Sequence, residues 1–200
     1  MTRNRLEAFT DAVIAIAITI MVLELTVPHE PTLDALRPLF PVIGAYVLSF
    51  VNLGIYWNNH HHMMSVVENV NGKILWANLY LLFWLSLFPF VTGWMGENDF
   101  DPVPTAAYGL VSLLAAIAYY LLQTAIVASQ GPGSKLAAAV GRDLKGKASP
   151  ALYLAGIGFS FVNRWIALGL YVFVALMWLV PDRRIESSLK ADAQEPVEVE

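Results

Sequence analysis

Long apolar runs separated by short polar segments make up most of the chain. Four of them cover residues 8–27, 39–57, 74–95 and 106–128. Each is long enough for one transmembrane helix, because a helix needs about 20 apolar residues to cross the hydrocarbon core of a bilayer. The pattern therefore predicts four membrane spans in the first two thirds of the chain.

A fifth apolar run covers residues 151–180 and is interrupted by Asn163 and Arg164. A single tilted helix with an arginine at its centre would be costly in a membrane. We therefore expect two shorter helices, at about 150–162 and 165–181. The prediction is an all-α integral membrane protein with six transmembrane helices in one domain, residues 1–182, followed by a tail.

Composition supports the membrane assignment and excludes several function classes. The chain is 57% hydrophobic and 14% charged, whereas soluble domains carry roughly 25% charged residues. Without cysteine, disulfides, thiolate catalysis and Cys-ligated metals are excluded. Because no phosphate-binding Gly loop or HExxH motif appears, we do not expect an enzyme. No internal repeat or broken helix is expected, which argues against a secondary transporter.

Lysine and arginine are distributed unequally between the segments that flank the predicted spans. With a cytoplasmic N-terminus, ten of them lie inside and only Arg37 and Arg164 lie outside. Positive residues favour the cytoplasmic side, so we expect a multi-pass protein of the cell membrane with both termini cytoplasmic. The acid-rich tail, residues 183–200, is typical of a disordered segment.

The first predicted span begins with charged and polar residues, among them Arg5, Thr10 and Asp11. A charge at membrane depth is costly and is usually kept for function. At about 100° per residue, Thr10 and Asp11 point away from one broad face. That face, here called the stripe, consists of Phe9, Ile16, Thr19, Ile20 and Leu23. The stripe faces a pore or a partner helix, and on the pattern alone helix packing is the simpler interpretation.

The second predicted span ends in polar and aromatic residues at the same depth as Asp11. Trp57, His60 and His61 have the spacing of one helix face, so they are natural partners for the carboxylate. Metal binding is disfavoured, because His60, His61 and His62 cannot all face one ion on a regular helix. A pH sensor stays open, since histidine titrates near neutrality.

Further polar residues lie inside the spans or at their ends. Glu24 follows the stripe at the outer end of the first span, where it either draws cations to a pore mouth or is hydrated by lipid headgroups. The others are interpreted as hydrogen-bonding residues between helices: Ser49, Asn52, Asn78, Ser86 and Gln123.

Two of these motifs together resemble the transmembrane protein 175 family in its prokaryotic form. They are Arg5-x-x-x-Phe9-Thr10-Asp11 in the first span and Trp57-Asn-Asn-His60-His61 in the second. The resemblance covers the whole chain in span order. It implies a potassium-selective cation channel that lacks the Thr-Val-Gly-Tyr-Gly filter, which this chain indeed lacks. It also implies a homotetramer in which the first helices line a central pore.

The resemblance assigns a role to each residue of the first helix. The hydrophobic constriction would be Ile16, Ile20 and Leu23, and the hydroxyl layer for selectivity would be Thr19. Thr10 stands where the family commonly has serine, and its hydroxyl is kept. The residues expected to brace the pore helix at its cytoplasmic end, with Thr10 and Asp11 binding the histidine and tryptophan, are Arg5, Phe9, Thr10, Asp11, Trp57, His60 and His61.

The sequence thus predicts a potassium channel that gates by wetting and drying a ring of Ile16 side chains, with Glu24 enriching cations outside. Expected partners are further copies of the chain, potassium ions and membrane lipids, without cofactor, metal or nucleic acid. Two alternatives stay open. One is a proton-coupled transporter or proton path through Asp11, His60 and His61, and the other is a non-conducting scaffold with the stripe as its oligomer seam.

Overall fold

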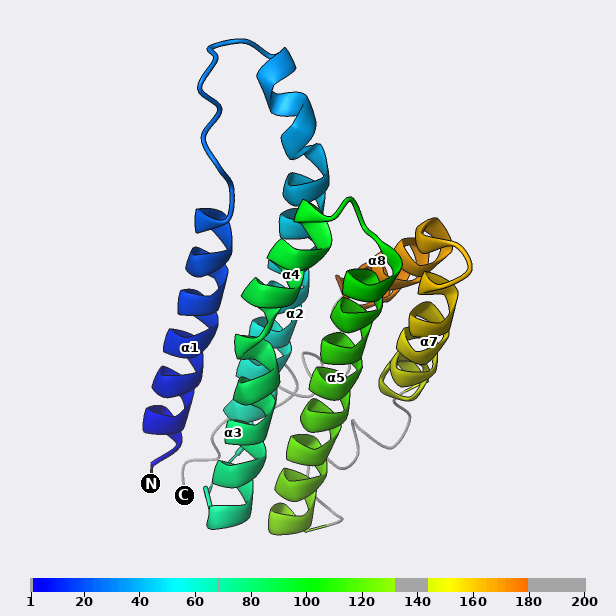
Figure 1. The fold of residues 1–200 in the computed structure, drawn as a ribbon. Coiled ribbons are helices and arrows are strands. Elements are labelled where there is room, and N and C mark those ends of the chain that lie inside the picture. Colours follow the sequence, from blue (N-terminus) through cyan, green and yellow to red (C-terminus); the bar gives the residue numbers. More distant parts are fainter. Residues whose placement is uncertain (1, 68, 132–143, 180–200) are drawn as a thin grey trace, which may run out of the picture.

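The computed structural model describes residues 2–67, 69–131 and 144–179. All regular structure in these residues is helical (Figure 1). The elements are α1 (Arg3–Leu23), the short 3-10 helix η1 (Asp34–Leu39), α2 (Phe40–Ser65), α3 (Gly72–Ser86), α4 (Phe88–Glu97), α5 (Pro102–Gln130), α7 (Leu144–Ser160) and α8 (Arg164–Leu179). The predicted acid-rich tail, residues 183–200, lies outside the described residues.

In the described residues six helices are counted, as predicted, when η1 is joined to α2 and α3 is joined to α4. Four of these helical segments are long and apolar enough to cross a membrane: α1, η1 with α2, α3 with α4, and α5. Helix α8 is apolar but shorter. The predicted division of the last apolar run is also present, because α7 ends at Ser160 and α8 begins at Arg164.

The third span is not the continuous helix that the sequence pattern predicted. It is interrupted at Leu87, between α3 and α4. Pro89 explains the break, because its ring has no N–H to donate and clashes with the carbonyl group four residues earlier, that of Leu85. The expectation that no span is broken is therefore corrected at this position.

Two helix ends also differ from the predicted ranges. Helix α1 ends at Leu23, before the apolar run does, because the β-branched residues that precede Pro28 are biased toward extended backbone. Helix α2 continues to Ser65, past the predicted end at Trp57. The Trp57–His62 segment therefore lies within a regular helix.

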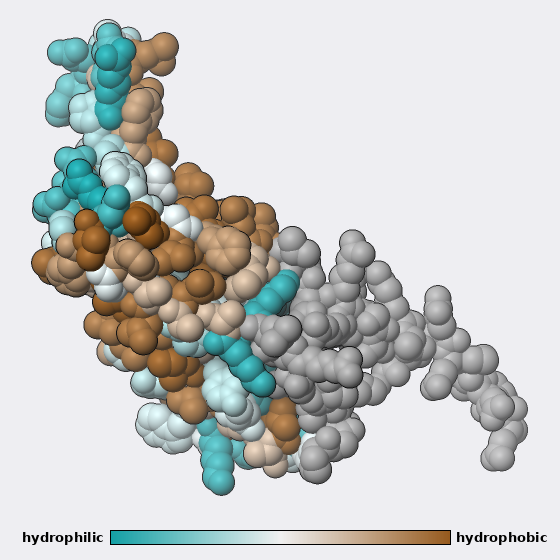
Figure 2. Space-filling view, turned by 90° about the vertical axis from the view of Figure 1, so that its right-hand side faces the viewer, coloured by the Kyte–Doolittle hydropathy of each residue, from teal (hydrophilic) through white to brown (hydrophobic). Residues whose placement is uncertain are grey.

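The helices form a bundle with α1 at one edge and α7 at the other (Figure 1). Helix α1 packs against α2, α3 and α4, whereas α5 packs against both α3 and α7. A broad hydrophobic band lies between more hydrophilic ends (Figure 2). Such a band is the surface that a bilayer core covers, and its presence agrees with a multi-pass membrane protein.

The C-terminal helix pair is fixed to α5 at its turn and along its length. Arg164 forms an ion pair with Asp101 at 3.1 Å and lies over the ring of Trp165. Tyr171 of α8 lies in the space left by Gly109 of α5 and Gly156 of α7, where an added Cβ would collide with its ring or hydroxyl. These two glycines allow the three helices to approach each other closely.

Candidate functional site

Helix α1 has one packed face and one uncovered face. Its buried residues follow helical spacing: Leu6, Thr10, Ile14, Ala17 and Met21. All residues of the stripe are exposed on the subunit, with Ile16 at 56% and Leu23 at 78% of their full surface. The stripe therefore takes no part in the packing of its own subunit.

Thr19 is the polar member of the stripe. Its hydroxyl donates to the carbonyl oxygens of Ala15 and Ile16, at 3.0 and 2.9 Å. Because the hydroxyl proton is directed to the backbone of α1, the lone pairs of the oxygen remain available on the uncovered side. The Thr19 oxygen can therefore bind a cation on the uncovered side of α1.

Asp11 and Thr10 hold α1 to two different helices. The indole N–H of Trp57 on α2 donates to Asp11 Oδ1 at 3.0 Å. Thr10 is completely buried, and its Oγ1 accepts from Asn78 Nδ2 on α3 at 2.9 Å. Asn78 Oδ1 lies 2.9 Å from His60 Nε2 on α2. These bonds join α1, α2 and α3 at one level.

The tryptophan contact agrees with what the resemblance implied, but the histidine contact does not. His60 reaches Thr10 only through Asn78, because the Asn78 amide lies between them. With Asn78 Nδ2 donating to Thr10, Oδ1 accepts, so His60 carries its proton on Nε2. From the sequence, Asn78 was expected only to form a hydrogen bond between helices. Nothing in its spacing indicates that it contacts the first-helix motif.

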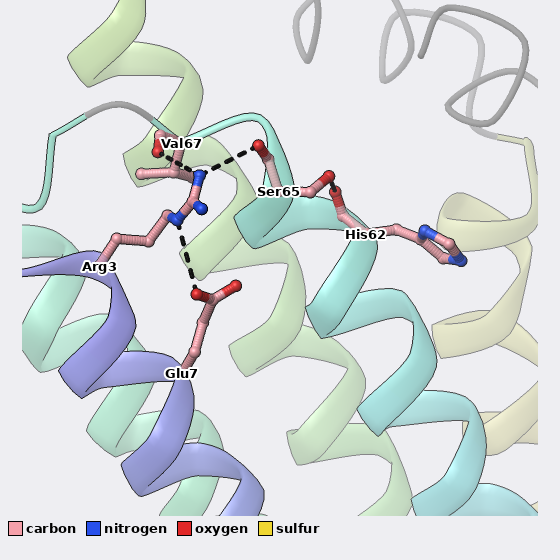
Figure 3. Close-up of polar contacts among 5 residues, drawn as sticks. All are labelled: Arg3, Glu7, His62, Ser65 and Val67. Carbon is pink, nitrogen blue, oxygen red and sulfur yellow. Dashed lines mark hydrogen bonds and ion pairs between the residues drawn. The ribbon is translucent and has the colours of Figure 1, made fainter. Parts of the chain in front are cut away.

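The start of α1 is bound to the end of α2 by Arg3 (Figure 3). Its Nη1 donates to the carbonyl oxygen of Ser65 at 3.2 Å and of Val67 at 3.5 Å, and its Nε lies 3.5 Å from Glu7 Oε2. A cation is favourable at a helix C-terminus, where carbonyl groups lack helical partners. In the described part of the chain, no such contact involves Arg5, which is exposed.

The three histidines have different surroundings. His60 is buried beside Asn78, whereas the exposed His61 stacks on Trp57 at 6.3 Å between ring centroids. His62 meets His61 edge to face. Within residues 2–67, 69–131 and 144–179, no group of three His, Asp or Glu side chains is placed to hold a metal ion.

Glu24 is exposed at the end of α1, but its side chain is turned toward α4. It lies against Gly93 and shares an open hollow with Trp94 and Glu97. At 100° per residue, Glu24 is offset by about 80° from Ile16 around the helix. The carboxylate therefore lies beside the stripe and not on its centre line.

Phe9 and Arg5 complete the set of predicted brace residues, and both are exposed. By helical spacing Arg5 lies close to the centre line of the stripe, whereas Thr10, five residues later, lies on the packed face of α1. The side-chain hydrogen bonds that hold α1 to its neighbours at this end are thus made by Arg3, Thr10 and Asp11.

Comparison with known proteins places the chain in a family. The sequence profile described as endosomal/lysosomal potassium channel TMEM175 matches residues 5–89. A potassium channel of Chryseobacterium sp. (strain P1-3) is 52% identical over 190 residues, covering 95% of this chain and 99% of that protein. A potassium channel of Chamaesiphon minutus is 30% identical over 196 residues, covering 86% and 91%.

A solved structure shows the same fold. It is the crystal structure of a lysosomal potassium-selective channel TMEM175 homolog from Chamaesiphon minutus, with a TM-score of 0.78 and 27% sequence identity. The match covers 90% of this chain and 97% of that one. The similarity includes both helices that carry the motifs, and the chain belongs to the TMEM175 family of ion channels.

Proposed function

We propose that the chain is one subunit of a homotetrameric, potassium-selective channel whose conduction path is lined by α1. The observation that carries this proposal is the uncovered stripe. A regular row of apolar side chains with one hydroxyl layer stays exposed, while another face of α1 is buried against its neighbours. In addition, two relatives that match along most of this chain are named potassium channels.

In the proposed tetramer, four Ile16 side chains surround the axis and form the narrowest ring. A narrow apolar ring excludes water and therefore ions, so the channel conducts when the ring is wetted. Ile20 and Leu23 form further apolar layers. The Thr19 oxygens between them replace part of the hydration shell of potassium, because their lone pairs are not used within α1.

The proposed orientation in the cell membrane has both termini in the cytoplasm. Arg3, Arg5 and Lys73 lie on helix ends at one end of the bundle, and the basic start of α7 points toward that end (Figure 1). Arg37 and Arg164 belong to the opposite end. The excess of positive charge at one end is what the rule for cytoplasmic loops predicts.

Ion flux from proteoliposomes tests this function. The protein is expected to pass potassium faster than sodium, and Ile16→Asn is expected to increase flux, because a polar side chain wets the ring. Leu110→Asn, at a similarly exposed apolar position on α5, is the matched control and should leave flux unchanged.

Absence of potassium flux, together with no change in Ile16→Asn, would refute the proposal and favour a scaffold. A proton path through Asp11 and His60 makes a different prediction. Acid-driven proton flux would then persist without potassium flux and would be lost in His60→Gln but not altered in Ile16→Asn.

A further inference from the structure

A second candidate site lies away from the stripe, inside the subunit. A cavity opens between α2, α5, α7 and α8, with about 570 Å³ of empty space when its open side is included. This figure includes space that is open to the surroundings, so the enclosed part of the cavity is much smaller. Its wall includes Tyr56 of α2, Gln123 of α5 and Tyr153 of α7.

Three polar side chains of this wall, those of Gln123, Tyr153 and Tyr56, make no hydrogen bond to the described residues. Tyr153 and Gln123 are 3% and 8% exposed, and neither side chain makes a hydrogen bond within the part of the chain that the structure describes. The hydroxyl of the half-buried Tyr56 likewise makes no hydrogen bond to the described residues. Buried polar groups nearly always have partners, and each one without a partner costs free energy. A ligand in the cavity would supply what these groups lack.

The wall also defines the chemistry of the ligand. None of its residues carries a charged side chain, so an ionic ligand would be desolvated without compensation. Most of the wall is aromatic or aliphatic, including Ile55, Ala116 and the ring of Trp178. The indole N–H of Trp178 is already donated to Ser149 at 2.8 Å. The Gln123 amide and the phenol groups of Tyr56 and Tyr153 are left to bind the ligand.

We propose that this cavity binds an uncharged amphiphile that carries a hydroxyl group, such as a medium-chain alcohol. Its hydroxyl group exchanges hydrogen bonds with Gln123, Tyr153 and Tyr56, and its hydrocarbon body contacts Ile55 and Ala116. The cavity shares no residue with the stripe, so a ligand bound in it lies outside the proposed pore.

Photolabelling of the protein in liposomes with 3-azioctanol, a photoreactive octanol, tests the site. Peptide mapping should find the label concentrated on cavity residues such as Tyr153, and excess octanol should compete. Gln123→Leu keeps the volume of the side chain but removes the amide, and should lower this labelling about fivefold, the factor expected for one hydrogen bond. Ala116→Trp fills the cavity and should reduce the labelling to background.

Matched controls are Thr124→Val and Ala151→Trp, whose side chains do not line the cavity and which should label like the unmodified protein. Label spread evenly over the membrane-facing surface, insensitive to octanol and to Gln123→Leu, would overturn the proposal and leave ordered water as the occupant. If Ala116→Trp does not assemble, Gln123→Leu alone decides. Neither result depends on ion flux, so this test is independent of the proposed channel function.

Discussion

Thr10 and Asp11 are adjacent in the sequence, yet their partners lie on different helices. Trp57 of α2 donates to Asp11, and Asn78 of α3 donates to Thr10. Successive residues of a helix point about 100° apart, so this pair can hold α1 from two sides at one level. The stripe is thereby given a fixed rotation relative to its own subunit.

Replacement of Asp11 tests whether this residue supports assembly rather than ion binding. Asp11→Ala removes the acceptor for Trp57 and is expected to lower the melting midpoint of the purified oligomer by several degrees, with little change in the potassium-to-sodium flux ratio. Asp11→Asn keeps an acceptor oxygen and should recover most of the stability. An unchanged midpoint in Asp11→Ala, combined with altered selectivity, would instead assign Asp11 to conduction.

The two arginines of the first turn provide a second test at single residues. Arg3→Gln removes the cation that binds the carbonyl groups at the end of α2, so the melting midpoint should fall. Arg5→Gln should change it less, because Arg5 is exposed and its side chain makes no such contact in the described residues. A larger loss in Arg5→Gln than in Arg3→Gln would contradict this and would mean that Arg5 contacts a neighbouring copy.

At the scale of elements, close approach between helices depends on small residues. Tyr171 of α8 lies against Gly109 of α5, and its hydroxyl donates to the carbonyl oxygen of Thr105 at 3.3 Å. Helices associate in membranes mainly through packing and interhelical hydrogen bonds, so positions without a side chain are where backbones come together. The α5–α7–α8 arrangement therefore relies on Gly109 and Gly156.

Gly109→Ala is expected to destabilise the subunit. Its Cβ would lie 2.0 Å from the Tyr171 hydroxyl oxygen, which forces α8 away from α5 at a cost of about 1–3 kcal/mol. Gly169→Ala is the control, since nothing lies within 4 Å of its added Cβ. Thermal unfolding followed by circular dichroism measures both, and equal midpoints would show that α8 packs differently from the arrangement described.

At the scale of the whole molecule, one subunit leaves its most regular surface uncovered. The stripe is exposed on α1 at the edge of the bundle (Figure 1). Four copies around an axis would bring these stripes together and enclose a path along them. The proposed function therefore belongs to the assembly, because one subunit cannot surround an ion.

Cysteine crosslinking tests this arrangement, and the chain has no cysteine of its own. Leu23→Cys, at the end of the stripe, should be joined between subunits by a short bis-maleimide, with products up to four subunits. Leu176→Cys, similarly exposed on α8, should give little product. Products limited to two subunits, or equal products from both variants, would exclude a tetramer lined by α1.

The positions of the helices and of the stripe could be read from the sequence. Membrane spans follow from the length of apolar runs, and the stripe follows from helical spacing, so both depend only on neighbours along the chain. The division at Asn163 and Arg164 was predictable for the same reason. The break at Leu87 was not predicted, although Pro89 is its local cause.

The partners of the polar residues were decided only by the tertiary structure. Nothing in the spacing of Asn78 shows that it lies between Thr10 and His60, and nothing near Arg3 shows that the end of α2 lies beside it. Such contacts depend on which helices are adjacent and at what height they cross. Helical spacing fixes the direction of a side chain around its own helix, whereas packing of the whole bundle determines what that side chain meets.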